Sequence, residues 1–168
     1  MQRKIQKAII GSIIAVAIAL AISYGGVVAQ DVQAPERSLD GVWLITITAR
    51  NCTTGEPLTA GFTTVFTFYK DTTMLASFLG SLTLERTAAH GVWRRDLAWN
   101  QYSYKFVHFR RNVVTGALAG KQESEGTLVL SDSGDAFTGN SSTTVFDAAG
   151  NPGTPGCSST AATRFQLE

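Results

Sequence analysis

Hydrophobic and polar residues alternate in short segments along most of the chain after Asp40, at a spacing of roughly ten residues. In the segment 42–50, Trp43, Ile45 and Ile47 fall on one face and threonines fall on the other. Successive side chains of a β-strand point to opposite faces, so this period of two predicts a half-buried strand. The β-branched residues of the segment favour the same structure.

The same pattern recurs along the rest of the chain, and Gly, Ser, Thr, Asn and Asp residues separate the segments. Further strands are predicted over 62–69, 74–79, 82–87, 92–97, 102–110, 127–131, 137–146 and 160–167. About eight short strands joined by turns, without a helical stripe, predict an all-β domain that is either a sandwich or a closed barrel. Gly-Val-Trp occurs twice, at Gly41 and Gly91, which leaves open a duplication of two four-stranded halves.

The first 29 residues differ from the rest of the chain. Basic residues at the start precede an apolar run over 8–22, and small residues follow up to Ala29. This order is typical of a secretory signal peptide, which predicts cleavage after Ala29, a single domain over 30–168 and export to the periplasm or the outside of the cell. An uncleaved anchor is the alternative, because the run from Ala8 to Ala29 is long enough to span a bilayer.

Both cysteines, Cys52 and Cys157, lie outside this leader. In an oxidising compartment two distant cysteines most simply form one disulfide. The loop-closure relation gives such a bond about 4–5 kcal/mol of stabilisation. Two free buried thiols are the alternative.

Four residues favour a barrel over a sandwich. Trp43 and Cys52 belong to the two ends of the first strand, and Arg164 and Cys157 belong to the two ends of the last. In an antiparallel pair of strands, the residue numbers of facing residues have a constant sum. The sums for Cys52 with Cys157 and for Trp43 with Arg164 agree within one diagonal step of the ladder. One register therefore joins the cysteines and places the guanidinium near the indole. Pairing of the first strand with the last closes an antiparallel up-and-down barrel of about eight strands.

Gly41-Val42-Trp43 on the first strand, together with Arg164 on the last, resembles the lipocalin and wider calycin pattern. In that pattern the Trp plugs the closed end of an eight-stranded barrel and the Arg packs across it. The resemblance covers the strand layout of 39–168 and implies a barrel that binds a small hydrophobic ligand. A calycin-type barrel similar to the allene oxide cyclase group fits the short turns as well, and it implies a cyclase or isomerase.

Composition excludes several other classes of function. The 168 residues carry a formal net charge of +1, with 16% charged and 44% hydrophobic residues, which argues against disorder and against nucleic-acid binding. The two histidines lack metal-ligand spacing, and no phosphate loop, dinucleotide fingerprint or nucleophile elbow occurs. We therefore expect no metal, no cofactor and no nucleic acid, and contact with a membrane only through an uncleaved leader.

Aromatic and aliphatic side chains are predicted to face the barrel interior, where they either line a pocket for a small hydrophobic or aromatic molecule or fill a solid core. These residues are Phe62, Phe66, Phe68, Tyr102, Tyr104, Phe106, Leu128 and Leu130. His108 shares the face of Tyr102, Tyr104 and Phe106, so it is either a polar anchor for a ligand, an acid or base, or a structural residue.

Three functions stay open. The first is a secreted lipocalin-like protein that binds its ligand without transforming it. The second is a cyclase or isomerase in which Tyr102, Tyr104 or His108 stabilises developing charge. The third is a structural or self-associating surface protein, for which the Thr-rich strand 137–146 offers a free edge. Glu123 and Glu125 are interpreted as a solvated pair at a polar turn.

Overall fold

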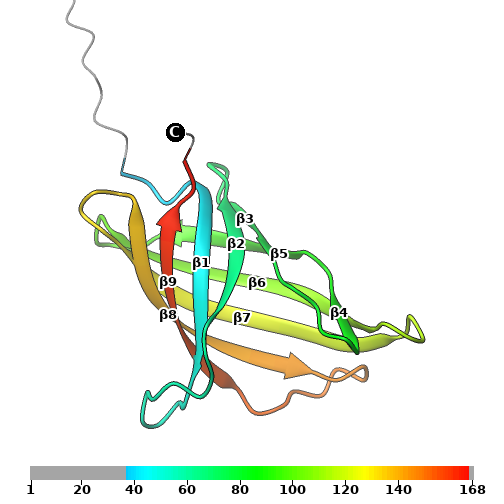
Figure 1. Cartoon of the computed structure of the whole chain (residues 1–168). Helices are drawn as coiled ribbons and strands as arrows, with labels where there is room; N and C mark the ends of the chain where they lie inside the picture. The colour runs from blue at the N-terminus through cyan, green and yellow to red at the C-terminus, as the bar shows by residue number, and fades with distance from the viewer. Residues whose placement is uncertain (1–36, 167–168) are drawn as a thin grey trace, which may run out of the picture. The chain divides into compact units, whose positions relative to one another are not determined.

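The computed structural model describes residues 37–166, which form strands and turns and contain no helix (Figure 1). The strands are β1 (Gly41–Arg50), β2 (Phe62–Phe68), β3 (Thr73–Ser77), β4 (Leu84–Arg86), β5 (Ala89–Arg95), β6 (Gln101–Asn112), β7 (Leu118–Leu130), β8 (Ala136–Phe146) and β9 (Gly156–Arg164). The predicted signal peptide over 1–29 lies outside the described residues. Within the described range there is no helix long and apolar enough to cross a membrane.

Eight of the nine strands close into an antiparallel barrel, as the sequence predicts. Apart from β4, each strand pairs with the next one along the chain, and β9 returns to pair with β1. β4 is an extra strand. It pairs with the same edge of β6 that β5 uses, and its register along β6 differs from that of β5 by one residue. In Figure 1, β1, β2 and β9 lie roughly vertical, with β1 antiparallel to the other two, whereas β5, β6 and β7 cross the view.

The pairing of β1 with β9 has the predicted register. Trp43 is the partner of Arg164, and Arg50 is the partner of Cys157. Cys52 lies two residues past Arg50, diagonally opposite Cys157, and the two cysteines form a disulfide. The closed barrel, the first-to-last pairing and the disulfide are therefore confirmed.

Two predictions about individual strands are wrong. β7 begins at Leu118 and not near residue 127, so Glu123 and Glu125 lie within a strand and not at a turn. The cause is the composition of its first half, in which charged residues face outward and the inward-facing residues, Gly120, Gln122 and Ser124, are not apolar either. β8 pairs with β7 and β9 along its length, so the strand over 137–146 offers no free edge for self-association.

One end of the barrel is closed by Trp43 and Arg164, which we call the closed-end pair. The Trp43 side chain is fully buried, and its indole N–H donates to the carbonyl of Leu39 (2.8 Å). The Arg164 guanidinium lies 4.3 Å from the centre of a Trp43 ring. It also donates to backbone carbonyls, including those of Ser38 (2.6 Å) and Gly134 (2.9 Å). These contacts fasten the end of β9 to the segment that precedes β1.

Candidate ligand-binding site

The interior of the barrel has a filled half and an open half. In the filled half, next to the closed-end pair, the predicted aromatic residues point inward and contact one another. Phe66 and Phe106 have ring centres 5.6 Å apart, and Tyr104 stacks on Phe106 at 5.9 Å. The buried residues of this half include Phe66, Phe68, Tyr102, Tyr104, Phe106, Leu128 and Leu130. These side chains fill the space between the strands and form the core.

The open half lies at the other end, where several inward-facing side chains are only partly buried. Ile47 and Ala49 on β1, Ser158 on β9, and Ser141 and Val145 on β8 are all only partly buried. Phe62 lies on the same inner face at the start of β2, and 43% of its surface is exposed. The inner faces of the strands are therefore partly accessible to solvent at this end.

Hydroxyl groups form one wall of the open half. The Ser141 and Ser158 hydroxyls lie 2.6 Å apart across β8 and β9, and those of Ser124 and Thr143 lie 2.8 Å apart across β7 and β8. Each hydroxyl both donates and accepts, so such pairs can exchange a partner for a ligand atom.

The two tyrosines that were predicted as site residues have protein partners. The Tyr102 hydroxyl accepts a hydrogen bond from the Arg95 guanidinium (3.0 Å). Burial raises the pKa of Tyr104, and hydrogen bonds with Ser141 and Thr160 offset part of that rise. Both hydroxyls are therefore already engaged by protein groups.

His108 is a fully buried polar side chain that lacks such partners among the described residues. Its side chain is fully buried, and neither ring nitrogen has a hydrogen-bond partner within residues 37–166. The ring lies against Phe78, with centres 5.1 Å apart. Burial, together with the nearby charges of Arg86 and Arg110, lowers the pKa of His108 to about 4. Since nearly all buried polar groups are paired, a neutral imidazole with two unused nitrogens needs an explanation.

Three residues around His108 were missed by the sequence analysis. Phe78 has the phase of the inward-facing Met74 and Ala76, and Arg110 continues the inward series of β6. Arg86 is the partner of Arg110 across β4 and β6. The alternation of inward and outward positions therefore predicted that these side chains face inward, but arginines near strand ends are normally expected to face solvent.

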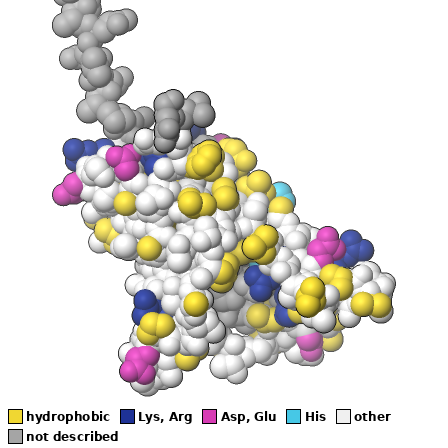
Figure 2. All heavy atoms as spheres, in the orientation of Figure 1, with side chains coloured by type: hydrophobic (Ala, Val, Ile, Leu, Met, Phe, Trp, Pro, Cys, Tyr) yellow, Lys and Arg dark blue, Asp and Glu magenta, His cyan; other side chains and the backbone are white. Residues whose placement is uncertain are grey.

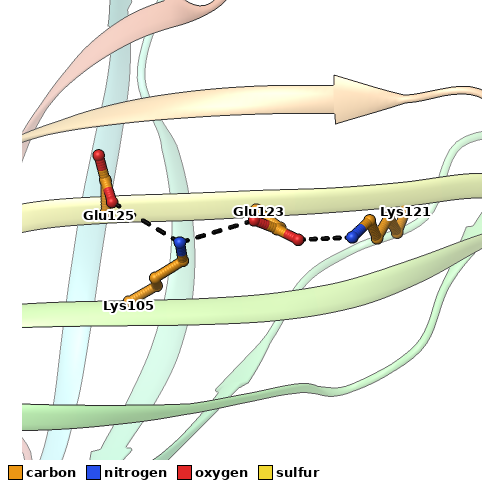
Figure 3. Close-up of polar contacts among 4 residues, drawn as sticks. All are labelled: Lys105, Lys121, Glu123 and Glu125. Carbon is orange, nitrogen blue, oxygen red and sulfur yellow. Dashed lines mark hydrogen bonds and ion pairs between the residues drawn. The ribbon is translucent and has the colours of Figure 1, made fainter. Parts of the chain in front are cut away.

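A concavity of about 730 Å³ extends over the outer surface of the barrel beside the β1–β2 loop, and its lining includes Lys105 and Glu125 as well as the inward-facing Tyr104, Ser141 and Ser158. On this surface the Lys105 ammonium lies 3.7 Å from a Glu123 carboxylate oxygen and 3.8 Å from one of Glu125 (Figure 3). Lys121 also contacts Glu123 at 2.6 Å, and this hydrogen bond is the main reason that the pKa of Glu123 is lowered. These charges neutralise one another, so they leave no unpaired ionic group for a ligand.

Residues 37–166 contain no group of three or more His, Cys, Asp and Glu side chains that could hold a metal ion. Comparisons with protein-family models, with curated proteins and with solved structures find no match.

Proposed function

We propose that the protein is an exported, lipocalin-like binding protein that holds a small hydrophobic ligand in the open half of its barrel and does not transform it. The observation that carries this proposal is the asymmetry of the interior. Trp43 and Arg164 close one end over packed rings, whereas Ile47, Ala49 and Val145 stay partly accessible at the other. A barrel of eight strands is just wide enough for one small ligand. The disulfide is compatible with an oxidising, exported environment.

The enzymatic alternative has less support. A cyclase or isomerase needs a polar group that is free to stabilise developing charge. Of the three residues predicted for this role, the hydroxyls of Tyr102 and Tyr104 are engaged by Arg95, Ser141 and Thr160, and His108 is fully buried.

The test is to fill the open half. Ala49→Phe adds a ring on the inner face of β1, whereas Leu44→Phe adds one on its outer face, where Leu44 is already exposed. Native mass spectrometry of the protein purified from its own host identifies any bound molecule, and titration with a hydrophobic fluorescent probe measures the site. We expect Ala49→Phe to weaken probe binding at least tenfold and Leu44→Phe to leave it unchanged. Equal probe binding by both variants and the parent, or protein that is empty and inert to the probe, contradicts the proposal.

A further inference from the structure

Three nitrogen-rich side chains lie together on the inner face of the barrel in its open half. Arg86 on β4 and Arg110 on β6 are direct partners across the antiparallel pair, so their side chains leave the same face of the sheet. His108 precedes Arg110 by two residues and shares that face. We call these three residues the cationic cluster.

The two arginines of the cationic cluster have no protein acceptor. Within residues 37–166, the guanidinium hydrogen bonds are made by Arg50, Arg95, Arg111 and Arg164. The ion pairs of the same residues use Arg94, Lys105 and Lys121. Arg86 and Arg110 take part in neither set, although both are half-buried.

Carboxylates near the cationic cluster do not compensate its charge. Glu85 lies on the opposite face of β4 from Arg86 and is exposed. Asp147 follows β8 and borders the same concavity as Arg110, but its two oxygens accept hydrogen bonds from Asn151 at 2.8 and 2.9 Å. Within the described strands no Asp or Glu occupies an inward-facing position. Two like charges on partner residues repel, and partial burial strengthens that repulsion.

The cationic cluster borders an apolar ring, and one of its three residues, Arg110, also lines a concavity. The Arg86 guanidinium lies 6.0 Å from the centre of the Phe78 ring, which also packs on Phe106 and on His108. A concavity of about 360 Å³ adjoins Arg110 and Val145. Figure 2 shows Lys and Arg side chains next to hydrophobic ones on the side of the molecule where β4 lies.

We infer that the cationic cluster binds the carboxylate of a ligand whose body is apolar. This inference rests on the proposed function and names the class of its ligand. Guanidinium forks match a carboxylate in shape and charge. His108 is fully buried, so the two half-buried arginines are the groups of the cluster that can reach a ligand. The apolar body lies against the aliphatic residues of the open half. A bound carboxylate gives Arg86 and Arg110 the acceptor that residues 37–166 do not supply.

Calorimetric titration of the full chain with octanoate, 1-octanol, acetate and inorganic phosphate tests this assignment. Octanoate and 1-octanol share the apolar chain and differ in charge, whereas acetate and phosphate carry charge without the chain. We expect octanoate to bind about 10- to 100-fold more tightly than 1-octanol, which is the usual range for charge-assisted hydrogen bonds. Acetate and phosphate bind at least tenfold more weakly than octanoate.

Variants identify the groups responsible. Arg86→Gln and Arg110→Gln each remove the preference for octanoate and leave 1-octanol binding unchanged, and Arg110→Lys restores part of the preference. Arg94→Gln, on the exposed outer face of β5, is the matched control and leaves both affinities unchanged. Thermal melts followed by circular dichroism confirm that each variant is folded, and Arg86→Gln alone decides the test if Arg110→Gln does not fold.

The possible failures are distinguishable. Equal binding of octanoate and 1-octanol in the parent, or an octanoate preference that survives both glutamine substitutions, overturns the carboxylate site and leaves the hydrophobic site standing. If phosphate or acetate binds as tightly as octanoate, the inference that the ligand has an apolar body is wrong. If neither octanoate nor 1-octanol binds, the carboxylate site and the proposed function both fail for chain-like ligands.

Discussion

At the scale of single residues, His108 combines an inward position on β6 with a complete lack of protein partners. Arg86 and Arg110 both contribute to the shift of its pKa to about 4, after burial. The ring packs against Phe78, which in turn packs against Phe106. The residue is therefore neutral in the folded protein wherever the pH is well above 4.

This neutrality predicts a pH-dependent stability. An unfolded histidine has a pKa near 6.5, so the unfolded chain binds a proton there below that pH. Folded His108 binds the proton only near pH 4 and below. The stability linked to neutral His108 is fully present above about pH 6.5. As the pH falls toward 4, the free energy of unfolding decreases by about 3 kcal/mol. Urea denaturation at a series of pH values, on protein freed of ligand, measures the slope.

His108→Phe removes the titrating group, so it should flatten that slope, and His90→Gln, at an exposed position of β5, should not. The lowered pKa values of Asp71, Glu123 and Asp147 also remove stability at low pH, but from about pH 4.5 downward. An unchanged slope between pH 6.5 and 4.5 in His108→Phe contradicts the assignment.

At the scale of elements, the join between β1 and β9 is fastened at its closed end by side chains as well as by the ladder. Arg164 spans from β9 to the carbonyls of Ser38 and Asp40 before β1, and to Gly134 before β8. Gly41 is required beside it, because its φ is +125° and an added Cβ would lie 2.7 Å from the Arg164 Nη1 atom. One guanidinium thus links three segments that are distant in the sequence.

Arg164→Met keeps the length of the side chain and removes these hydrogen bonds and the contact with Trp43. We expect it to lower the free energy of unfolding by about 3 kcal/mol, because buried carbonyls lose their donors. Arg94→Met, on the outer face of β5, should change it by less than about 0.5 kcal/mol. Chemical denaturation of both variants makes the comparison, and equal stability of the two would show that the closed-end pair does not hold the barrel shut.

At the scale of the whole molecule, the return of β9 to β1 removes the free edges of an eight-stranded sheet. The Cys52–Cys157 disulfide lies at the opposite end of the β1–β9 ladder from the closed-end pair, so the two ends of this join are fixed by different means. Together they hold the first and last strands of the barrel in one register.

Replacing both cysteines by serine tests the disulfide. The loop-closure relation predicts a loss of about 4–5 kcal/mol in the free energy of unfolding, because the unfolded chain regains the freedom of a loop of more than 100 residues. The intact mass of the exported protein should be lower by two hydrogens than that of the reduced chain. Free thiols in exported protein, or a double variant as stable as the parent under reducing and oxidising conditions alike, would count against this role.

The sequence predicted well those elements in which one face is apolar and the other polar. β1 and β6 were placed within a few residues, because Trp43, Ile45, Tyr102 and Phe106 alternate with polar neighbours. The first half of β7 was missed, since inward-facing residues such as Ser124 are polar as well and leave no contrast between the faces. The same lack of contrast hid Arg86 and Arg110.

The sequence by itself determined the all-β class, the inward face of most strands, the disulfide and the pairing of Trp43 with Arg164, because each depends on periodicity or on one register along two strands. Only the tertiary structure decided which part of the interior is filled, since that depends on how side chains from strands distant in the sequence meet across the barrel. It also placed Arg86 beside Arg110 and left His108 without a partner. Burial and pairing are properties of the assembled interior, whereas alternation is a property of each strand alone.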